Sequence, residues 1–241
     1  MAADLNKHYV VELIGLPGAG KSILGFETIQ LLKKDQYSCY NYDQIFKNNV
    51  INTNKWLKSL FYYLKNFNLF FSLILYTLSS SPPDLAIKRY NLGRFIELLK
   101  LIVILDLSRK KIEQPSLMIF DQGIVQCLWS ITSMGGQIKK DILKKSISTK
   151  KHVFPDIIIF VDIEPSTAVQ RIAKRNSKCV FDHLEPAQTW NLFVLQRNNY
   201  KAILEGVTDV INIPVLTVNG NDSIKDNTHI ITHYIKKIIK G

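Results

Sequence analysis

Hydrophobic residues are concentrated in short, nearly continuous runs that alternate with longer amphipathic stretches. A short, nearly continuous apolar run predicts a strand that is buried on both faces, as in a parallel sheet. Apolar residues spaced three and four apart predict helices. The expected strands are Tyr9–Ile14, Tyr37–Tyr42, Leu117–Phe120, Ile157–Val161 and Val215–Val218, and the expected helices are Lys21–Leu32, Gln122–Ser133, Ser166–Lys174 and Ile224–Ile239. This alternation predicts one α/β domain over residues 1–241, with a five-stranded parallel sheet sandwiched by helices and ligands at the carboxyl ends of the strands.

One interval, between the second and third strands, departs from this alternation. Residues 44–115 contain no convincing strand but two helical patterns, Trp56–Leu78 and Leu92–Leu107. The interval is too apolar for a linker, so we expect a helical insertion that stands over the ligand-binding edge of the sheet. Its most apolar part, Phe67–Leu78, is shorter than the roughly 20 residues that cross a bilayer. A buried helix is favoured there, and peripheral contact with a membrane is the alternative.

A phosphate-binding pattern joins the first strand to the first helix. It reads Gly15-Leu16-Pro17-Gly18-Ala19-Gly20-Lys21-Ser22, a complete G-x-x-x-x-G-K-S. In this setting the glycines let backbone N–H groups turn toward phosphate oxygens, Lys21 neutralises the outer phosphates and Ser22 can bind Mg²⁺. We therefore predict that this P-loop, together with the adjacent Ile23, binds ATP, and that ATP and Mg²⁺ are the cofactors.

Two aspartates stand where predicted strands end, and therefore at the same edge of the sheet. Asp121 follows the third strand, where P-loop enzymes place the acid that holds Mg²⁺; capping of the next helix is the alternative. Asp43 follows the second strand and could orient or deprotonate an acceptor hydroxyl, with a plain turn or cap residue as the alternative. The sequence leaves open which of the two acts as the base.

Two arginines follow the fourth strand. Arg171 and Arg175 are four residues apart, so a helix that starts at Pro165 would place both on one face. Two guanidinium groups on one face could hold the transferring phosphoryl group and stabilise its developing charge. Solvated surface arginines are the alternative interpretation.

These segments together resemble the thymidylate kinase-like group of P-loop kinases. The resemblance is carried by the P-loop, by Asp121-Gln122-Gly123, by Val161–Pro165 with the two arginines, and by Val215–Asn221 before the last helix. It covers about two-thirds of the chain and leaves out the insertion. It implies that residues 171–185 form a lid over ATP and that Asn219 and its loop lie beside the adenine. The insertion at residues 44–115 is expected to bind the acceptor for a different reason, which is its position over the ligand-binding edge of the sheet.

One departure from that group concerns the acceptor. Thymidylate kinases usually carry Asp-Arg after the third strand, where the arginine meets the acceptor phosphate, but this chain has Gln122. A phosphate in a partly dry cleft needs matched donors, preferably arginines. We therefore expect a kinase that is inefficient with dTMP, although Arg89 and Arg94 in the insertion could supply the missing charge.

Composition and charge restrict the remaining choices. The 241 residues carry a net charge of +11, which attracts phosphorylated ligands, nucleic acid and anionic membranes alike. Three separated cysteines, Cys39, Cys127 and Cys179, indicate a reduced compartment, and the polar N-terminus lacks the pattern of a secretory signal, so the cytoplasm is the expected location. We expect no nucleic-acid partner and no transmembrane segment; monomer and homodimer stay open.

The sequence thus favours an ATP- and Mg²⁺-dependent phosphotransferase whose acceptor is a nucleoside, a nucleotide or a similar small hydroxyl compound. Two alternatives remain. One is a nucleotide-dependent regulatory ATPase that acts as a switch. The sequence has no Asn-Lys-x-Asp segment for guanine recognition, which argues against a GTPase. The other is a kinase of a sugar or lipid-linked precursor, which only the apolar insertion suggests.

Overall fold

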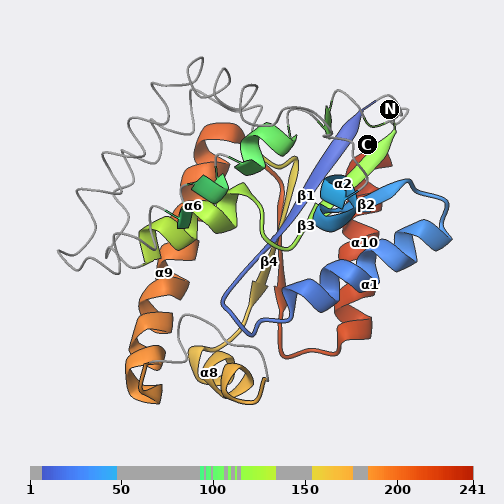
Figure 1. Ribbon diagram of the computed structural model, residues 1–241. Helices are drawn as coiled ribbons and strands as arrows, with labels where there is room; N and C mark the ends of the chain where they lie inside the picture. The colour runs from blue at the N-terminus through green and yellow to red at the C-terminus, as the bar shows by residue number, and fades with distance from the viewer. Residues whose placement is uncertain are drawn as a thin grey trace.

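The computed structural model describes residues 7–47, 115–133, 154–175 and 184–240, together with most positions between 93 and 112. Five parallel strands form one sheet in the order β2-β3-β1-β4-β5 (Figure 1). The strands are β1 (His8–Ile14), β2 (Cys39–Asn41), β3 (Ser116–Phe120), β4 (Ile157–Asp162) and β5 (Val215–Asn219). The three central strands are almost wholly buried, as their continuous apolar runs predict.

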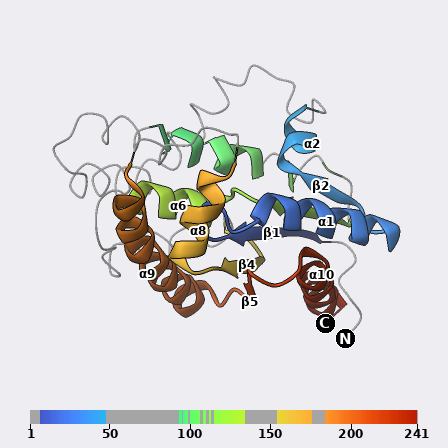
Figure 2. The same ribbon diagram turned by 90° about the horizontal axis from the view of Figure 1, so that it is seen from below.

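Helices cover both faces of the sheet. They are α1 (Lys21–Lys34), α2 (Tyr42–Lys47), α6 (Ile124–Ser133), α8 (Pro165–Ala173), α9 (Pro186–Ile211) and α10 (Ile224–Lys240). Helices α1 and α10 pack together on one face, and α6 and α9 pack together on the other (Figure 1). Figure 2 views the molecule from the side on which the strands end, where α1 follows β1 and α8 follows β4. The predicted α/β fold is confirmed.

Polar residues set several of the helix starts. Asn41 precedes α2 and exchanges hydrogen bonds with Gln44: the Asn41 N–H donates to Gln44 Oε1 at 3.1 Å, and the Gln44 N–H donates to Asn41 Oδ1 at 2.8 Å. This reciprocal pair is a capping box. Ser223 accepts a hydrogen bond from the Asp226 N–H at 3.0 Å before α10, and Pro165 and Pro186 begin α8 and α9.

The structure corrects three details of the sequence analysis. The second strand ends at Asn41, so Tyr42 and Asp43 lie in α2, because the capping box starts the helix there. The helix after β3 begins at Ile124, two residues later than predicted. The 26-residue helix α9 was missed altogether.

Part of the expected organisation falls outside the described residues. This applies to most of the insertion at 44–115, including Phe67–Leu78 and Arg89, and to positions 176–183 of the expected lid. Helical backbone is described at most positions of 93–105, within the predicted helix Leu92–Leu107. In the parts of the chain that are described, no helix has the length and hydropathy needed to span a bilayer.

Candidate active site

The P-loop runs from the end of β1 to the first residue of α1. Gly18 and Gly20 have φ angles of 81° and 90°, which residues with side chains seldom adopt. A Cβ atom on Gly15 would lie 2.4 Å from the Val161 carbonyl oxygen of β4. The loop therefore lies directly against the neighbouring strand, and its glycines allow both the turn and this close approach.

Lys21 folds back over the loop. Its Nζ donates hydrogen bonds to the carbonyl oxygens of Gly15 at 2.8 Å and Leu16 at 3.0 Å. Burial lowers the pKa of Lys21 to about 8; the carboxylate of Asp121 opposes this shift, and the charge of Arg175 adds to it. The ammonium group thus lies over the P-loop, in buried surroundings that disfavour its charge.

Ser22 and Asp121 meet although 99 residues separate them in sequence. The Ser22 hydroxyl donates a hydrogen bond to Asp121 Oδ2. The sheet causes this meeting: β1 pairs with β3 in a register that sets Glu12 beside Phe120, so Asp121 emerges next to the P-loop. Hydroxyl and carboxylate oxygens are ligands that Mg²⁺ prefers, and Mg²⁺ commonly needs only one or two carboxylates besides phosphates and water. The pair therefore fits a Mg²⁺ ion, although the described residues hold no cluster of three or more acidic, His or Cys side chains.

Glu12 of β1 binds the start of α6, just after Asp121, and was not singled out by the sequence analysis. Only 1% of its surface is exposed, and its two carboxylate oxygens accept the N–H groups of Gln126 at 2.7 Å and Val125 at 3.1 Å. Burial raises the pKa of Glu12 to about 7, against the opposing effect of these N–H groups. Glu12 therefore caps the start of α6, the role that the sequence analysis gave as the alternative for Asp121. A lone acid inside an apolar run was the available signal.

Asp43 lies exposed in the first turn of α2, at the same edge of the sheet. Asn41 of β2 pairs with Ile119 of β3, so Asp43 and Asp121 each stand two residues beyond a paired position. Tyr42 packs edge-on against Phe120, with ring centroids 6.4 Å apart, and fixes the start of α2 on the end of β3. The two predicted acids therefore follow neighbouring strands.

The structure places Arg171 beside the P-loop but does not place the two arginines on one helix face. Helix α8 ends at Ala173, one residue before the predicted end at Lys174, so Arg175 lies beyond the helix. Arg171 donates hydrogen bonds to the carbonyl oxygens of Gly220 at 2.9 Å and Gly18 at 3.4 Å, and thereby links the P-loop to the loop after β5. Arg175 lies close enough to affect the pKa of Lys21.

The loop after β5 is held by its own side chains. Asn219 Nδ2 donates to Asp222 Oδ1 at 2.8 Å, and Asn219 Oδ1 accepts the Asn221 N–H at 3.1 Å. A Cβ atom on Gly220 would lie 2.2 Å from Ile163 and 3.2 Å from the Ala19 carbonyl oxygen. The loop therefore packs directly on the P-loop, as a segment beside a bound nucleotide would.

Arg197 of α9 is a second residue that the sequence analysis missed. Its guanidinium group binds both carboxylate oxygens of Asp162, at 2.7 and 2.8 Å, and Glu164 at 2.7 Å. These hydrogen bonds, the ones to Asp162 above all, raise the pKa of Arg197. Because Asp162 is the last residue of β4, the pairing fastens the middle of α9 to the edge of the sheet that carries the site.

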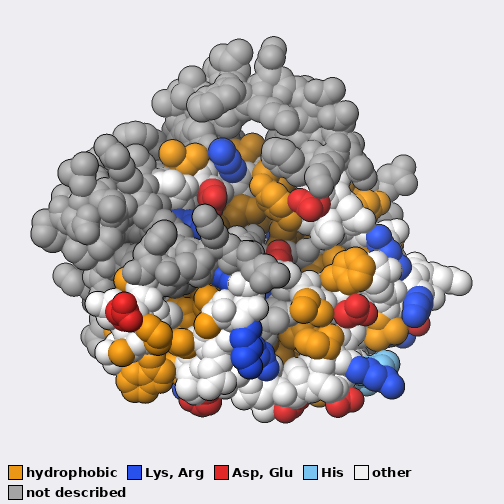
Figure 3. Space-filling view, turned by 60° about the horizontal axis from the view of Figure 1, so that its bottom comes forward, with side chains coloured by type: hydrophobic (Ala, Val, Ile, Leu, Met, Phe, Trp, Pro, Cys, Tyr) orange, Lys and Arg blue, Asp and Glu red, His pale blue; other side chains and the backbone are white. Residues whose placement is uncertain are grey.

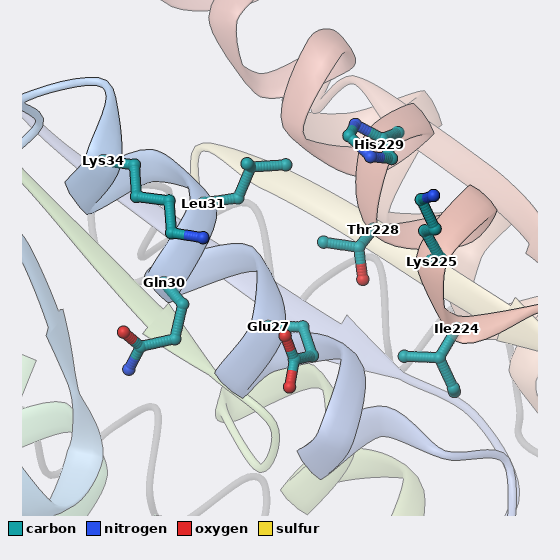
Figure 4. A pocket seen from close by; sticks show the side chains of 8 residues that line it. All are labelled: Glu27, Gln30, Leu31, Lys34, Ile224, Lys225, Thr228 and His229. Carbon is teal, nitrogen blue, oxygen red and sulfur yellow. The ribbon is translucent and has the colours of Figure 1, made fainter.

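Two surface depressions are visible. Figure 3 brings the lower side of Figure 1 toward the viewer. On this side, charged side chains of both signs border a hollow with hydrophobic side chains at its floor. A separate groove of about 350 Å³ lies between α1 and α10 (Figure 4). The groove is lined by Glu27, Gln30, Leu31, Lys34, Ile224, Lys225, Thr228 and His229. None of the predicted site residues lines it.

Comparisons with known proteins agree with this architecture. No family model and no curated protein matches the sequence. A solved structure of deoxyadenosine kinase from M. mycoides, with the product dCMP and a flexible dCDP bound, matches with a TM-score of 0.53 and 18% identity, covering 95% of this chain and 99% of that one. The same kinase with dCTP bound matches with a TM-score of 0.52 and 15% identity, over 95% and 99% of the two chains. At such identities the likeness establishes the fold, and the chain has the fold of a P-loop kinase.

Proposed function

We propose that this protein transfers the γ-phosphoryl group of ATP to a hydroxyl group of a small acceptor, as nucleoside and nucleotide kinases do. One observation carries the proposal: the Ser22 hydroxyl and the Asp121 carboxylate meet beside a complete P-loop at the carboxyl edge of a parallel sheet. P-loop enzymes need this combination of phosphate-binding loop and metal-holding oxygens. The fold shared with deoxyadenosine kinase supports the same reaction class.

The residues of the candidate site have separate roles in this proposal. Lys21 leaves the carbonyl oxygens of Gly15 and Leu16 and binds the outer phosphates, while the loop N–H groups hold the remaining phosphate oxygens. Ser22 and Asp121 hold Mg²⁺, which neutralises charge on the transferring group when it is bound. Arg175 adds positive charge near Lys21, and Arg171 keeps the loop after β5 against the P-loop.

We assign Asp121 to the metal and Asp43 to the acceptor. Asp121 is bonded to Ser22 beside the P-loop, whereas Asp43 is exposed after the neighbouring strand and directly precedes in sequence the insertion that we expect to bind the acceptor. A carboxylate there can orient the acceptor hydroxyl and accept its proton during transfer. The proton moves to Asp43 as the acceptor oxygen bonds to phosphorus and ADP leaves.

The acceptor class follows from Gln122 and from the structural comparison. Gln122 is exposed beside Asp121 and offers an amide where thymidylate kinases offer a guanidinium group, so an acceptor without a phosphate fits better than dTMP. The similar kinase binds deoxynucleotides, so deoxynucleosides are the first acceptors to test.

The test is transfer from labelled ATP to a panel of deoxynucleosides, ribonucleosides, nucleoside monophosphates and sugars, with Mg²⁺. We expect label in a deoxynucleoside product, formed about 10² to 10³ times more slowly with Lys21→Ala, since loss of such a charge commonly costs that much in rate. Release of phosphate without a labelled product would instead support the regulatory ATPase. A kcat/KM for dTMP within roughly 10⁴ to 10⁸ M⁻¹s⁻¹ would contradict the assignment of the acceptor.

A further inference from the structure

Gly15, the first residue of the P-loop, is held from both sides by buried side chains of helices α6 and α9. Its N–H donates to Gln126 Oε1 of α6 at 3.3 Å, and its carbonyl oxygen accepts the Tyr200 hydroxyl of α9 at 2.7 Å. Tyr200 is fully buried and Gln126 is 7% exposed. We propose that Tyr200 and Gln126 are positioning residues of the donor site, which set ATP affinity without touching ATP.

Both side chains are themselves fixed in place. The ring of Tyr200 stacks on Trp129 of α6, with centroids 4.4 Å apart and ring planes 11° apart. The Trp129 indole N–H donates to the Gln196 carbonyl oxygen of α9 at 3.2 Å, and the Gln126 N–H is held by Glu12. Helices α6 and α9 are therefore joined to each other directly beneath the loop. A hydroxyl held by such packing keeps its direction at little further entropic cost.

Tyr200 matters most when ATP is bound. In the described part of the chain, two side-chain donors share the Gly15 carbonyl oxygen: the Tyr200 hydroxyl and the Lys21 ammonium at 2.8 Å. On the proposed function, Lys21 leaves this oxygen to bind phosphate, so Tyr200 remains as its donor. Without the hydroxyl, Lys21 could move only by leaving a buried carbonyl oxygen unpaired, which is costly. The hydroxyl therefore favours the ATP-bound arrangement over the free one.

The experiment compares Tyr200→Phe with wild type and with Tyr234→Phe, a matched control whose ring packs on the core from α10. ATP affinity is measured by titration calorimetry, and stability by thermal unfolding without ATP. We expect Tyr200→Phe to weaken ATP binding roughly 5- to 150-fold, the effect of one unpaired buried acceptor, with little change in the unfolding temperature. Tyr234→Phe should match wild type in affinity. Equal affinity of Tyr200→Phe and wild type would overturn the proposal.

A second measurement does not depend on ATP. In the free protein each donor can compensate for loss of the other, so Lys21→Ala and Tyr200→Phe together should lower the unfolding temperature by more than the sum of the single changes. If the changes in unfolding temperature were additive, Tyr200 and Lys21 would not both support the Gly15 carbonyl oxygen. Gln126→Met should lower stability with and without ATP, because the Gly15 N–H then lacks its partner in either state. It should weaken ATP binding by letting Gly15 shift from the position that directs the loop toward the phosphates. If wild type itself did not bind ATP, the proposed function would fail, while the stability cycle would still test the support of Gly15.

Discussion

The lowered pKa of Lys21 makes ATP affinity depend on pH in a direction that the structure fixes. Burial brings the pKa of the free protein to about 8, because the ammonium group loses water and faces the charge of Arg175, with Asp121 only partly compensating. Bound phosphates favour the charged ammonium and raise its pKa again. ATP binding therefore takes up a proton wherever the free lysine is neutral. Affinity is fully present below pH 8 and is lost as the pH rises above it.

The size of the effect follows from the pKa of about 8. At pH 8 about half of the free molecules lack the proton, so binding should take up about 0.5 proton for each ATP. At pH 9 about one molecule in ten carries it, so the dissociation constant should be about tenfold larger than at pH 7. The terminal phosphate of ATP ionises at lower pH, with a second pKa of about 6, and its ionisation would strengthen binding, so a loss of affinity at pH 9 reports on the protein.

Titration calorimetry at pH 7, 8 and 9, in buffers of different ionisation enthalpy, measures both the affinity and the proton uptake. Lys21→Ala is the control: its affinity should be lower throughout, with no proton uptake near pH 8. A constant affinity of wild type between pH 7 and pH 9 would refute the reasoning. So would an undiminished proton uptake by the alanine variant, because the titrating group would then lie elsewhere.

Three further changes test other parts of the site. Asp121→Asn should leave the unfolding temperature unchanged, because Glu12 and not Asp121 binds the first N–H groups of α6. The same change should abolish most phosphoryl transfer at ordinary Mg²⁺ concentration, and retained activity at saturating Mg²⁺ would show that Asp121 is only structural. Gly123→Ala should destabilise the fold by about 1 to 3 kcal/mol in denaturant unfolding, because its Cβ would lie 2.4 Å from the buried Glu12 carboxyl carbon; an unchanged midpoint would contradict this packing. Arg197→Met should cost about 1 to 3 kcal/mol in the same measurement by leaving Asp162 unpaired, and Lys201→Met on the exposed face of α9 is its control.

The parts of the site that the sequence predicted share one property, which is that local pattern determines them. The P-loop needs only consecutive residues between a strand and a helix, so its motif identifies it directly. Asp121 could be placed because the carboxyl ends of parallel strands share one edge of the sheet. The hydrogen bond between Ser22 and Asp121 agrees with that expectation. Topology and one motif thus sufficed for the atoms expected to contact phosphate.

The supporting residues could not be found in this way, because their roles depend on partners far away in sequence. Glu12 is explained only by the start of α6, more than a hundred residues later, where its carboxylate receives two N–H groups. A carboxylate inside a buried strand is energetically costly unless it has hydrogen-bond donors, and the sequence alone does not show which donors it has. Sequence reasoning therefore noticed the apolar run and passed over the acid within it.

Helix α9 was missed for a related reason. Its buried face includes Thr189, Gln196 and Asn199 among the apolar residues, so the stripe that normally identifies a helix is interrupted. The start of the helix was still visible in Pro186 and Gln188, whose side chain accepts the Glu185 N–H at 3.1 Å. Two of the interruptions, Gln196 and Asn199, occur where α9 meets the site: Trp129 binds the Gln196 backbone, Arg197 binds Asp162 and Tyr200 binds Gly15. The features that hid this helix from pattern analysis therefore lie beside the residues by which it supports the phosphate-binding loop.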